Sequence, residues 1–384
     1  MTTHELPPVP RRRHRVFGGL TERQERTFTG IAGLVVIAFM IGWVGAVHQA
    51  LEQRSEVARQ QAAIGIRTPA PTVTPTRQIA STLLASGPKT AYISDAMMQF
   101  LSPLRGASGK LLFTTRVPGA PIVKNAPAGG KTVLTGGGAQ TTSQFIAPRS
   151  PGIYRLAVQL QQATRSLDNF SLITLVPFAQ KQGGKIGLYY LGTWPFENGG
   201  RPKTPAYADP AGFIQVTPQN ENTPVSPHFR LRDFLTHNQA DVWPKYLLLR
   251  PQLVDKLELT IQELQNMGHP VRHMSIMSGF RTPTYNVSGG NTEGRANLSR
   301  HMYGDASDVF VDNDGNGSMD DLNGDGKVDI RDAEVIQQAA ERVEAANPSL
   351  VGGVGVYSAC CGHGPFVHID VRGYRARWRG FGNG

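Results

Sequence analysis

Cysteine is nearly absent from this chain of 384 residues: only Cys360 and Cys361 are present, and they are adjacent. A neighbouring pair cannot join distant parts of the chain, so a disulfide framework of the kind that holds small secreted domains together is excluded. Stability must instead come from hydrophobic cores. The pair itself has three interpretations: ordinary loop thiols, which is the simplest, a vicinal disulfide, or soft metal ligands acting with His363.

Charged residues are also few, at 18%, against 40% hydrophobic residues. This balance is typical of a globular rather than a disordered chain, and the length predicts two or three compact units. Glycine-rich phosphate loops and RNA-binding signatures are absent, so the net charge of +10 does not indicate a nucleic-acid partner. Part of that charge has another explanation, which lies near the N-terminus.

One long apolar run extends from Phe28 to Val47 with no ionisable side chain over twenty residues. As a helix it spans about 30 Å, which matches the core of a bilayer. Six arginines precede it: Arg11, Arg12, Arg13, Arg15, Arg23 and Arg26. Positive charge on one flank marks the cytoplasmic side, and no clear signal-peptidase site follows. We therefore predict a cytoplasmic basic tail at 1–27, a single transmembrane helix at 28–48 in the cytoplasmic (inner) membrane, and a periplasmic or otherwise extracytoplasmic location for the remainder.

The remaining chain is predicted to contain a stalk and two folded parts. Residues 49–88 begin with helical composition and continue into a proline-threonine linker. Residues 89–225 hold short runs of β-branched and aromatic residues between Gly/Pro turns, which predict a β-sandwich-like domain with a hairpin, followed by an irregular connector. Residues 226–384 combine extended runs with two helical patterns, at 251–268 and 333–346, which predict an α+β unit.

Potential metal ligands converge only in this last unit. His301 and Asp308 lie seven residues apart at the entry to a predicted strand, and His368 lies in another strand. Two imidazoles and a carboxylate from separate elements can hold zinc in a tetrahedron whose fourth position stays open for water. The plainer alternative is a polar contact between His301 and Asp308, with His368 as an ordinary core histidine.

Three segments carry a family resemblance: SGFRTPTYN from Ser278, SRHMYGDASDV from Ser299, and GGVGVYS followed by FVHID. Together they resemble the zinc D-alanyl-D-alanine carboxypeptidase family, which includes VanX-type dipeptidases, murein endopeptidases and the hedgehog fold. The resemblance covers most of residues 226–384. It implies a hedgehog-like α+β zinc-peptidase domain, zinc ligands His301, Asp308 and His368, and a role for Arg281 in contacting the substrate carbonyl or carboxylate.

The chain departs from that family at the position of its general base. VanX-like members have a glutamate three residues before the last ligand, where this chain has Pro365, and another branch has H-x-H, where this chain has Phe366. Strand alternation places Asp370 on the same face as His368. Asp370 can therefore act as the general base, which we keep as the first hypothesis, or orient His368 by accepting its second N–H.

A second constellation is a nine-residue repeat, DNDGNGSMD followed by DLNGDGKVD. Oxygen ligands at alternating positions, with glycine at the sixth and an apolar residue at the eighth, resemble an EF-hand-type loop, so we predict calcium binding within an insertion at 312–332. The alternative is a hydrated acidic loop. The predicted calcium ligands are Asp312, Asp314, Asn316, Asp320, Asp321, Asn323, Asp325, Asp329 and Asp332.

These features predict a membrane-anchored, extracytoplasmic zinc peptidase that hydrolyses amide bonds in peptidoglycan stem peptides, as a carboxypeptidase or an endopeptidase. A single anchor, a stalk and a cationic body suit a fixed anionic wall polymer. The competing prediction is a non-catalytic module that keeps its metal and binds the cell wall, or acts as a calcium-dependent scaffold.

Overall fold

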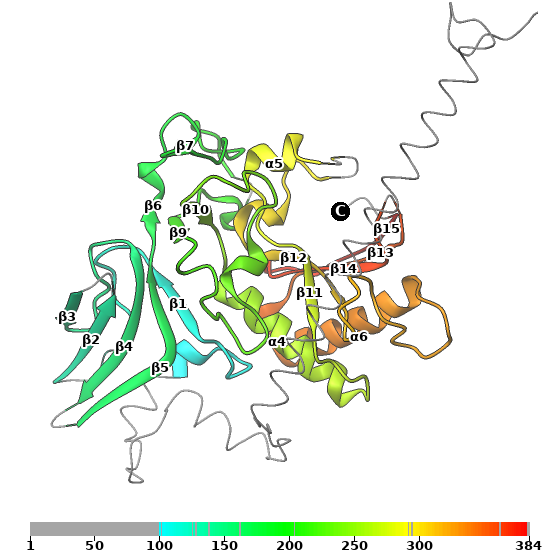
Figure 1. Cartoon of the computed structure of the whole chain (residues 1–384), viewed down its shortest axis with the longest axis horizontal. Helices are drawn as coiled ribbons and strands as arrows, with labels where there is room; N and C mark the ends of the chain where they lie inside the picture. The colour runs from blue at the N-terminus through cyan, green and yellow to red at the C-terminus, as the bar shows by residue number, and fades with distance from the viewer. Residues whose placement is uncertain are drawn as a thin grey trace, which may run out of the picture. The chain divides into compact units, whose positions relative to one another are not determined.

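The structure is a computed structural model that describes residues 100–381, apart from 101, 125, 127–128, 137–138, 161–162, 203, 291, 293–294 and 361 (Figure 1). The predicted basic tail, transmembrane helix and stalk lie outside the described residues. Among the residues described, no helix is both long and apolar enough to cross a membrane. Several β-sheets and few helices form a mixed architecture, as the sequence predicts at that coarse level.

The β-rich part forms a five-stranded sheet in the order β1-β5-β4-β2-β3. Its strands are β1 (Phe113–Arg116), β2 (Gly130–Gly136), β3 (Ala139–Ser143), β4 (Gly152–Leu160) and β5 (Ala163–Thr174). β1 runs parallel to β5, and the other neighbours are antiparallel. Alternate apolar side chains pack with the segment before β1 into a core of its own, made by residues between 100 and 172.

A smaller sheet follows, with the strand order β10-β9-β6. It contains β6 (Val176–Pro177), β9 (Gly212–Val216) and β10 (Lys245–Leu247), and the predicted hairpin is β7 (Lys185–Ile186) with β8 (Tyr189–Tyr190). The predicted connector is not wholly irregular, because β9 lies within it. Short 3₁₀ helices are η1 (Phe178–Gln180), η2 (Pro205–Tyr207) and η3 (Leu231–Phe234).

The C-terminal part is built on a second five-stranded sheet, in the order β11-β12-β14-β13-β15. Its strands are β11 (Met274–Ser278), β12 (Ala306–Val311), β13 (Gly353–Ser358), β14 (Phe366–Asp370) and β15 (Ala376–Phe381). Its helices are α4 (Pro251–Asn266), α5 (Pro283–Ser288) and α6 (Ile330–Ala346), with η4 (Arg300–Tyr303) and η5 (Pro348–Leu350). α6 packs against α4 and against β13 and β14 (Figure 1).

The two long helices form where the apolar spacing predicts them. Proline begins α4, and Leu253, Leu257 and Ile261 on one face are fully buried. In α6 the side chain of Asp329 accepts a hydrogen bond from the backbone of Arg331, which caps the first turn. Packing of these apolar faces joins α4 to α6 and places α6 against the sheet that carries the candidate ligands.

Candidate metal centre

Neighbouring elements place His301, Asp308 and His368 side by side. Asp308 in β12 and His368 in β14 are directly paired in the antiparallel register. His301 lies in η4, which ends at Gly304 in the left-handed region, φ 65°. A Cβ at Gly304 would lie 2.4 Å from the backbone of Leu248, so only glycine allows the turn that leads from η4 into β12.

Three potential ligand atoms meet at one point. His301 Nε2 lies 3.2 Å from Asp308 Oδ1 and 3.1 Å from His368 Nδ1, and the last two atoms are 2.9 Å apart. Ligands of a tetrahedral zinc with bonds of 2.0–2.1 Å are separated by about 3.3 Å. The three residues form a buried group that is able to hold a metal ion. The sequence prediction of this ligand set agrees with that geometry.

The outer ring nitrogens of both histidines lie beside groups that can accept a hydrogen bond from them. His301 Nδ1 lies 2.7 Å from the carbonyl oxygen of Gly279. A carbonyl oxygen can only accept a hydrogen bond, so Nδ1 is the donor in this contact. His368 Nε2 lies 3.0 Å from Asp370 Oδ2. When those nitrogens carry the protons of neutral rings, both inner nitrogens present lone pairs, and Asp308 adds a carboxylate oxygen. Three lone pairs in contact repel one another unless a cation lies among them, so this donor set fits zinc.

Burial and charge set the protonation of these groups. Burial, together with the charge of Arg281, lowers the pKa of His301 to about 4. Burial also opposes ionisation of Asp308, but His301 and Arg281 outweigh it and hold the pKa of that carboxyl well below its usual value. For His368 burial is outweighed by hydrogen bonds to Asp308 and Asp370, which raise its pKa. Asp308 is thus an anion and His301 a neutral ring at pH 7.

Arg281 interacts directly with one of the candidate ligands, Asp308. It is 4% exposed, its Nη2 donates to Asp308 Oδ2, and its Nε donates to Ser278 Oγ at 2.8 Å. The guanidinium thereby holds the second oxygen of Asp308, leaving Oδ1 for the metal position. Its Nη1 has no partner among the described residues, and it lines the same pocket as the ligands.

Asp370 lies behind His368, on the side away from the converging atoms. The carboxylate is fully buried and accepts from His368, from the backbone of Gly353 at 2.7 Å, and from the guanidinium of Arg372. Burial opposes its ionisation, but His368 and Arg372 outweigh it and lower its pKa strongly. A carboxylate so occupied, with the imidazole between it and the metal position, is placed to orient His368; this geometry disfavours the base role.

The ligands open into a pocket of about 430 Å³. Aromatic side chains form part of its wall: Trp378 lies 5.1 Å from the His368 ring and donates through Nε1 to the hydroxyl of Tyr357 at 2.7 Å. Gly355 makes room for the indole, since a Cβ there would lie 2.2 Å from it. Sequence reasoning missed Trp378, Tyr357 and Arg372; strand alternation from Asp370 could have indicated only Arg372.

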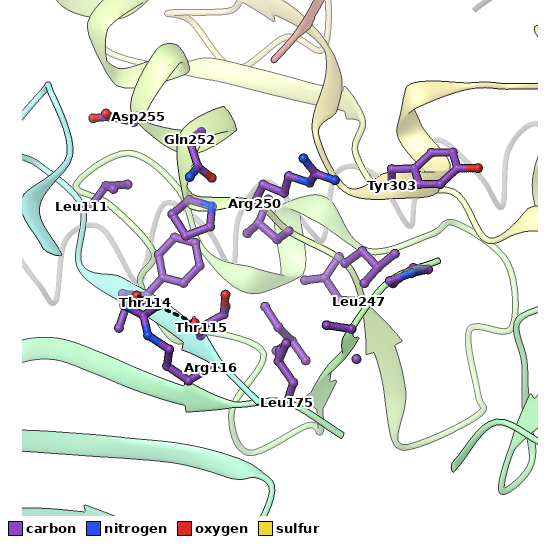
Figure 2. A pocket seen from close by; sticks show the side chains of 18 of the residues that line it. Leu111, Thr114, Thr115, Arg116, Leu175, Leu247, Arg250, Gln252, Asp255 and Tyr303 are labelled. Atoms are coloured by element: carbon purple, nitrogen blue, oxygen red, sulfur yellow. Dashed lines mark hydrogen bonds between the residues drawn. The ribbon is translucent and has the colours of Figure 1, made fainter. Parts of the chain in front are cut away.

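A larger pocket of about 580 Å³ lies elsewhere, beside β1 and the start of α4 (Figure 2). Arg116 donates to Thr114 Oγ1 at 2.8 Å in its wall, and Arg250, Asp255 and Tyr303 also line it. None of the described metal-ligating groups includes its residues. Size alone therefore does not mark the chemical centre of this protein.

The acidic repeat behaves differently in its two copies. Carboxylates of Asp312, Asp314 and Asp320 from the first copy lie within 4.8 Å of one another and can hold a metal. In the second copy the carboxylates do not form such a group among the described residues. Their partners are cationic or backbone groups: Arg331 pairs with Asp325 and Asp329, Asp332 accepts from the amides of Leu322 and Asn323, and Asp321 accepts from Gly324 and Gly326.

Two amides of the repeat make local hydrogen bonds. Asn316 donates to Asp314 at 2.9 Å and accepts from the backbone of Ser318. Asn323 accepts from the backbone of Asp325 at 2.9 Å. Both side chains thus support loop geometry. Among the described residues of the insertion, the group that can hold a metal ion is formed by the three carboxylates of the first copy.

The state of Cys360 differs from the simplest interpretation, which was a pair of ordinary loop thiols. Cys360 is disulfide-bonded, so the prediction of ordinary loop thiols is wrong. Cys361 lies outside the described residues. His363 forms a backbone bridge with Cys360, its Nδ1 lies 2.8 Å from the carbonyl of Gly364, and it does not belong to either metal-binding group.

Comparison of the chain with family models, with curated proteins and with solved structures finds no match in any of the three. The resemblance carried by the motifs therefore remains a prediction, and the function must be argued from the geometry of the site.

Proposed function

We propose that this chain is a zinc-dependent peptidase of the D-alanyl-D-alanine carboxypeptidase type, with a hedgehog-like α+β domain, which hydrolyses amide bonds in peptidoglycan stem peptides. The observation that carries the proposal is the meeting of three potential ligand atoms at about 3 Å from one another, beside an open pocket. An ordinary core histidine needs no such arrangement. The order of the three sequence motifs adds the substrate class.

Zinc held there would supply Lewis-acid chemistry, by polarising an amide carbonyl and making water nucleophilic at neutral pH. Hydrolysis adds the hydroxyl of water to the carbonyl carbon and a proton to the departing amine. Arg281 and Asp370 keep Asp308 and His368 in the required orientation. Tyr357 lines the pocket, and burial raises the pKa of its hydroxyl. The hydroxyl therefore keeps its proton at neutral pH and can donate a hydrogen bond to a substrate.

The proposal includes a calcium ion at Asp312, Asp314 and Asp320, whose hard oxygen ligands suit calcium as the imidazoles suit zinc. The first of these ligands, Asp312, directly follows β12, which carries Asp308. A calcium ion bound there would therefore stabilise the end of that strand. The proposed location is extracytoplasmic, with the chain anchored in the inner membrane by residues 28–48. The partners are then the wall peptides and the lipid bilayer.

Turnover of purified muropeptides by the full chain tests the peptidase proposal. We expect the zinc-loaded protein to release amino acid or peptide from the stem, and His301→Ala to abolish release while the melting temperature of the metal-free protein changes little. A wild-type protein that holds zinc but binds muropeptides without cleaving them would contradict the peptidase and favour the wall-binding module.

A further inference from the structure

The pocket at the metal centre contains one arginine that has no carboxylate partner within the described part of the chain. Four arginines line this pocket. Three of them are ion-paired with buried aspartates: Arg281 with Asp308, Arg300 with Asp305, and Arg372 with Asp370. Arg295 has no carboxylate partner among the described residues. An unpaired guanidinium beside a metal position is a candidate anion-binding group.

Arg295 is held in place by uncharged groups. Its Nη1 donates to the carbonyls of Tyr285 at 2.9 Å and of Gly289 at 2.6 Å, and its guanidinium lies 5.1 Å from the centre of the Tyr285 ring. Nε is buried and finds no hydrogen-bond partner among the residues that the structure describes. The guanidinium is therefore positioned before any ligand arrives; the Tyr285 side chain also interacts with it, and none of its donors has a carboxylate partner among the described residues.

Arg281 supplies a second free donor to the same pocket. Its Nε and Nη2 are occupied by Ser278 and Asp308, whereas its Nη1 has no partner among the described residues. Burial and the repulsion between the two guanidinium groups lower the pKa of Arg295. The charge of Asp308, which pairs with Arg281, opposes this effect on Arg295, but Asp308 also faces the metal position. A further anion would relieve this repulsion.

We infer that Arg295, with Arg281, binds the free C-terminal carboxylate of the substrate, so that the last peptide bond lies at the metal centre. The inference rests on the proposed function and deepens it: the protein is a carboxypeptidase that removes the terminal residue, and peptides without a free terminus are poor substrates. A carboxylate on a substrate side chain has the same chemistry, and the test separates the two sources. Arg295 acts here as a specificity residue.

Steady-state kinetics of the zinc-loaded full chain provide the first test. The substrates are a stem pentapeptide ending in D-alanyl-D-alanine, the same peptide amidated at its C-terminus, and the same peptide amidated only at its side-chain carboxylate. We expect C-terminal amidation to raise KM at least tenfold and side-chain amidation to change it little. Arg295→Gln should raise KM for the free acid by a similar factor, leave KM for the C-terminal amide unchanged, and be partly rescued by Arg295→Lys.

Arg342→Gln is the matched control, because Arg342 lies on α6, is 60% exposed and pairs with Glu263 outside the pocket. Its kinetics should equal those of the wild type. Zinc content and melting temperature are measured for every variant, so a folding defect is recognised. Equal KM values for the free acid and the C-terminal amide, or an effect of side-chain amidation alone, would overturn the inference.

A binding measurement separates failure of the subsite from failure of the proposed function. N-acetyl-D-alanine and its amide are titrated calorimetrically into the wild type and Arg295→Gln. We expect the acid to bind the wild type at least tenfold more tightly than the amide, and this difference to vanish in the variant. Such discrimination without any hydrolysis would contradict the peptidase while supporting the subsite; hydrolysis without discrimination would do the reverse.

Discussion

The two histidines of the metal centre are fixed by different acceptors. A backbone carbonyl, that of Gly279, receives the outer N–H of His301, whereas a buried carboxylate, that of Asp370, receives the outer N–H of His368. A carboxylate behind a ligating imidazole raises its basicity and fixes the orientation of the ring. Arg372 and the backbone of Gly353 in turn hold Asp370, so His368 has few alternative positions.

Asp370→Asn tests that role. The amide keeps the size of the side chain but loses the charge that holds the His368 N–H, so we expect zinc affinity to fall about 10–100-fold. Competition with a chelating dye measures it. Asp241→Asn, at an exposed carboxylate, is the control. Loss of kcat with unchanged zinc affinity would instead identify Asp370 as the general base.

At this scale the sequence predicted the ligand set and missed the wall of the pocket. His301, Asp308 and His368 lie in motifs with fixed spacing, and strand alternation relates His368 to Asp370. Trp378 and Arg295 belong to no motif, and they reach the pocket only because β15 and the segment after α5 fold back onto it. Contacts between distant segments leave no local signal in the sequence.

Buried charges connect the helices to the strands that carry the site. Lys256 in α4 is fully buried and donates to Glu344 in α6 at 2.6 Å and to the backbone carbonyl of Asp370 in β14 at 2.7 Å. Burial lowers the pKa of Lys256, and the charge of Glu344 opposes this effect. The ammonium thus joins both helices to the end of the strand that holds His368.

Glu258 on the same helix predicts a pH dependence of stability. Its carboxylate contacts His228 Nδ1 at 2.9 Å and Lys110 at 3.6 Å. Burial raises its pKa, but these partners outweigh burial and lower the pKa below the ordinary value. A lowered folded-state pKa gives stability that is present above the unfolded-state pKa, about 4.5, and is lost as the pH falls through the folded-state value.

We therefore expect Glu258→Gln to reduce the free energy of unfolding by about 1–3 kcal/mol at pH 7, and by less as the pH falls below about 4.5. Urea unfolding of the metal-free protein at several pH values measures the difference. Glu263→Gln, on the same helix with a partly exposed side chain, should give a small and nearly constant difference. A loss at Glu258 that grows with acidification would contradict the assignment.

The acidic insertion predicts a stabilising effect of calcium. A cation that binds only the folded state at a hundredfold over its Kd adds roughly 2.7 kcal/mol. We expect calcium to raise the melting temperature and Asp314→Asn to remove most of that rise, because Asp314 belongs to the three-carboxylate group. Differential scanning calorimetry, with zinc content measured in parallel, makes the comparison.

Asp325→Asn is the matched variant in the second copy, where the carboxylate pairs with Arg331. It should leave the calcium response largely intact. A melting curve that neither calcium nor a chelator changes would contradict the calcium site and favour the alternative of a hydrated acidic loop. The repeat predicted both copies equally. Backbone amides donate to carboxylates of both copies, and the pairing of Arg331 with Asp325 and Asp329 sets the second copy apart.

Helices and strands with a regular spacing of apolar residues could be predicted from the sequence, but the elements that they pair with could not. The leucines of α4 recur at helical spacing, and the β-rich runs alternate as strands do. The parallel pairing of β1 with β5 joins segments more than fifty residues apart, from Phe113 with Ser171 onward. Nothing in either segment specifies that partner, so the sequence predicted strands here but not their order.

At the scale of the whole molecule, the larger hydrophobic core crosses the predicted boundary at residue 226. It includes Leu111 and Phe113 before that position and Val354 and Ile369 far after it. Asp255 in α4 strengthens the connection by accepting from the backbone amides of Ala107 at 2.6 Å and Ser108 at 2.8 Å. Composition marks turn-rich segments as boundaries, but it does not reveal that apolar side chains on both sides share one core.

The proposals for this chain all depend on one zinc ion held between His301, Asp308 and His368. Atomic emission analysis of the purified full chain tests it most directly. We expect about one zinc per chain, lost in His368→Ala and retained in His363→Ala, whose histidine lies in the neighbouring loop outside the ligand group. Substoichiometric zinc that is unchanged by His368→Ala would contradict a zinc site at these three residues.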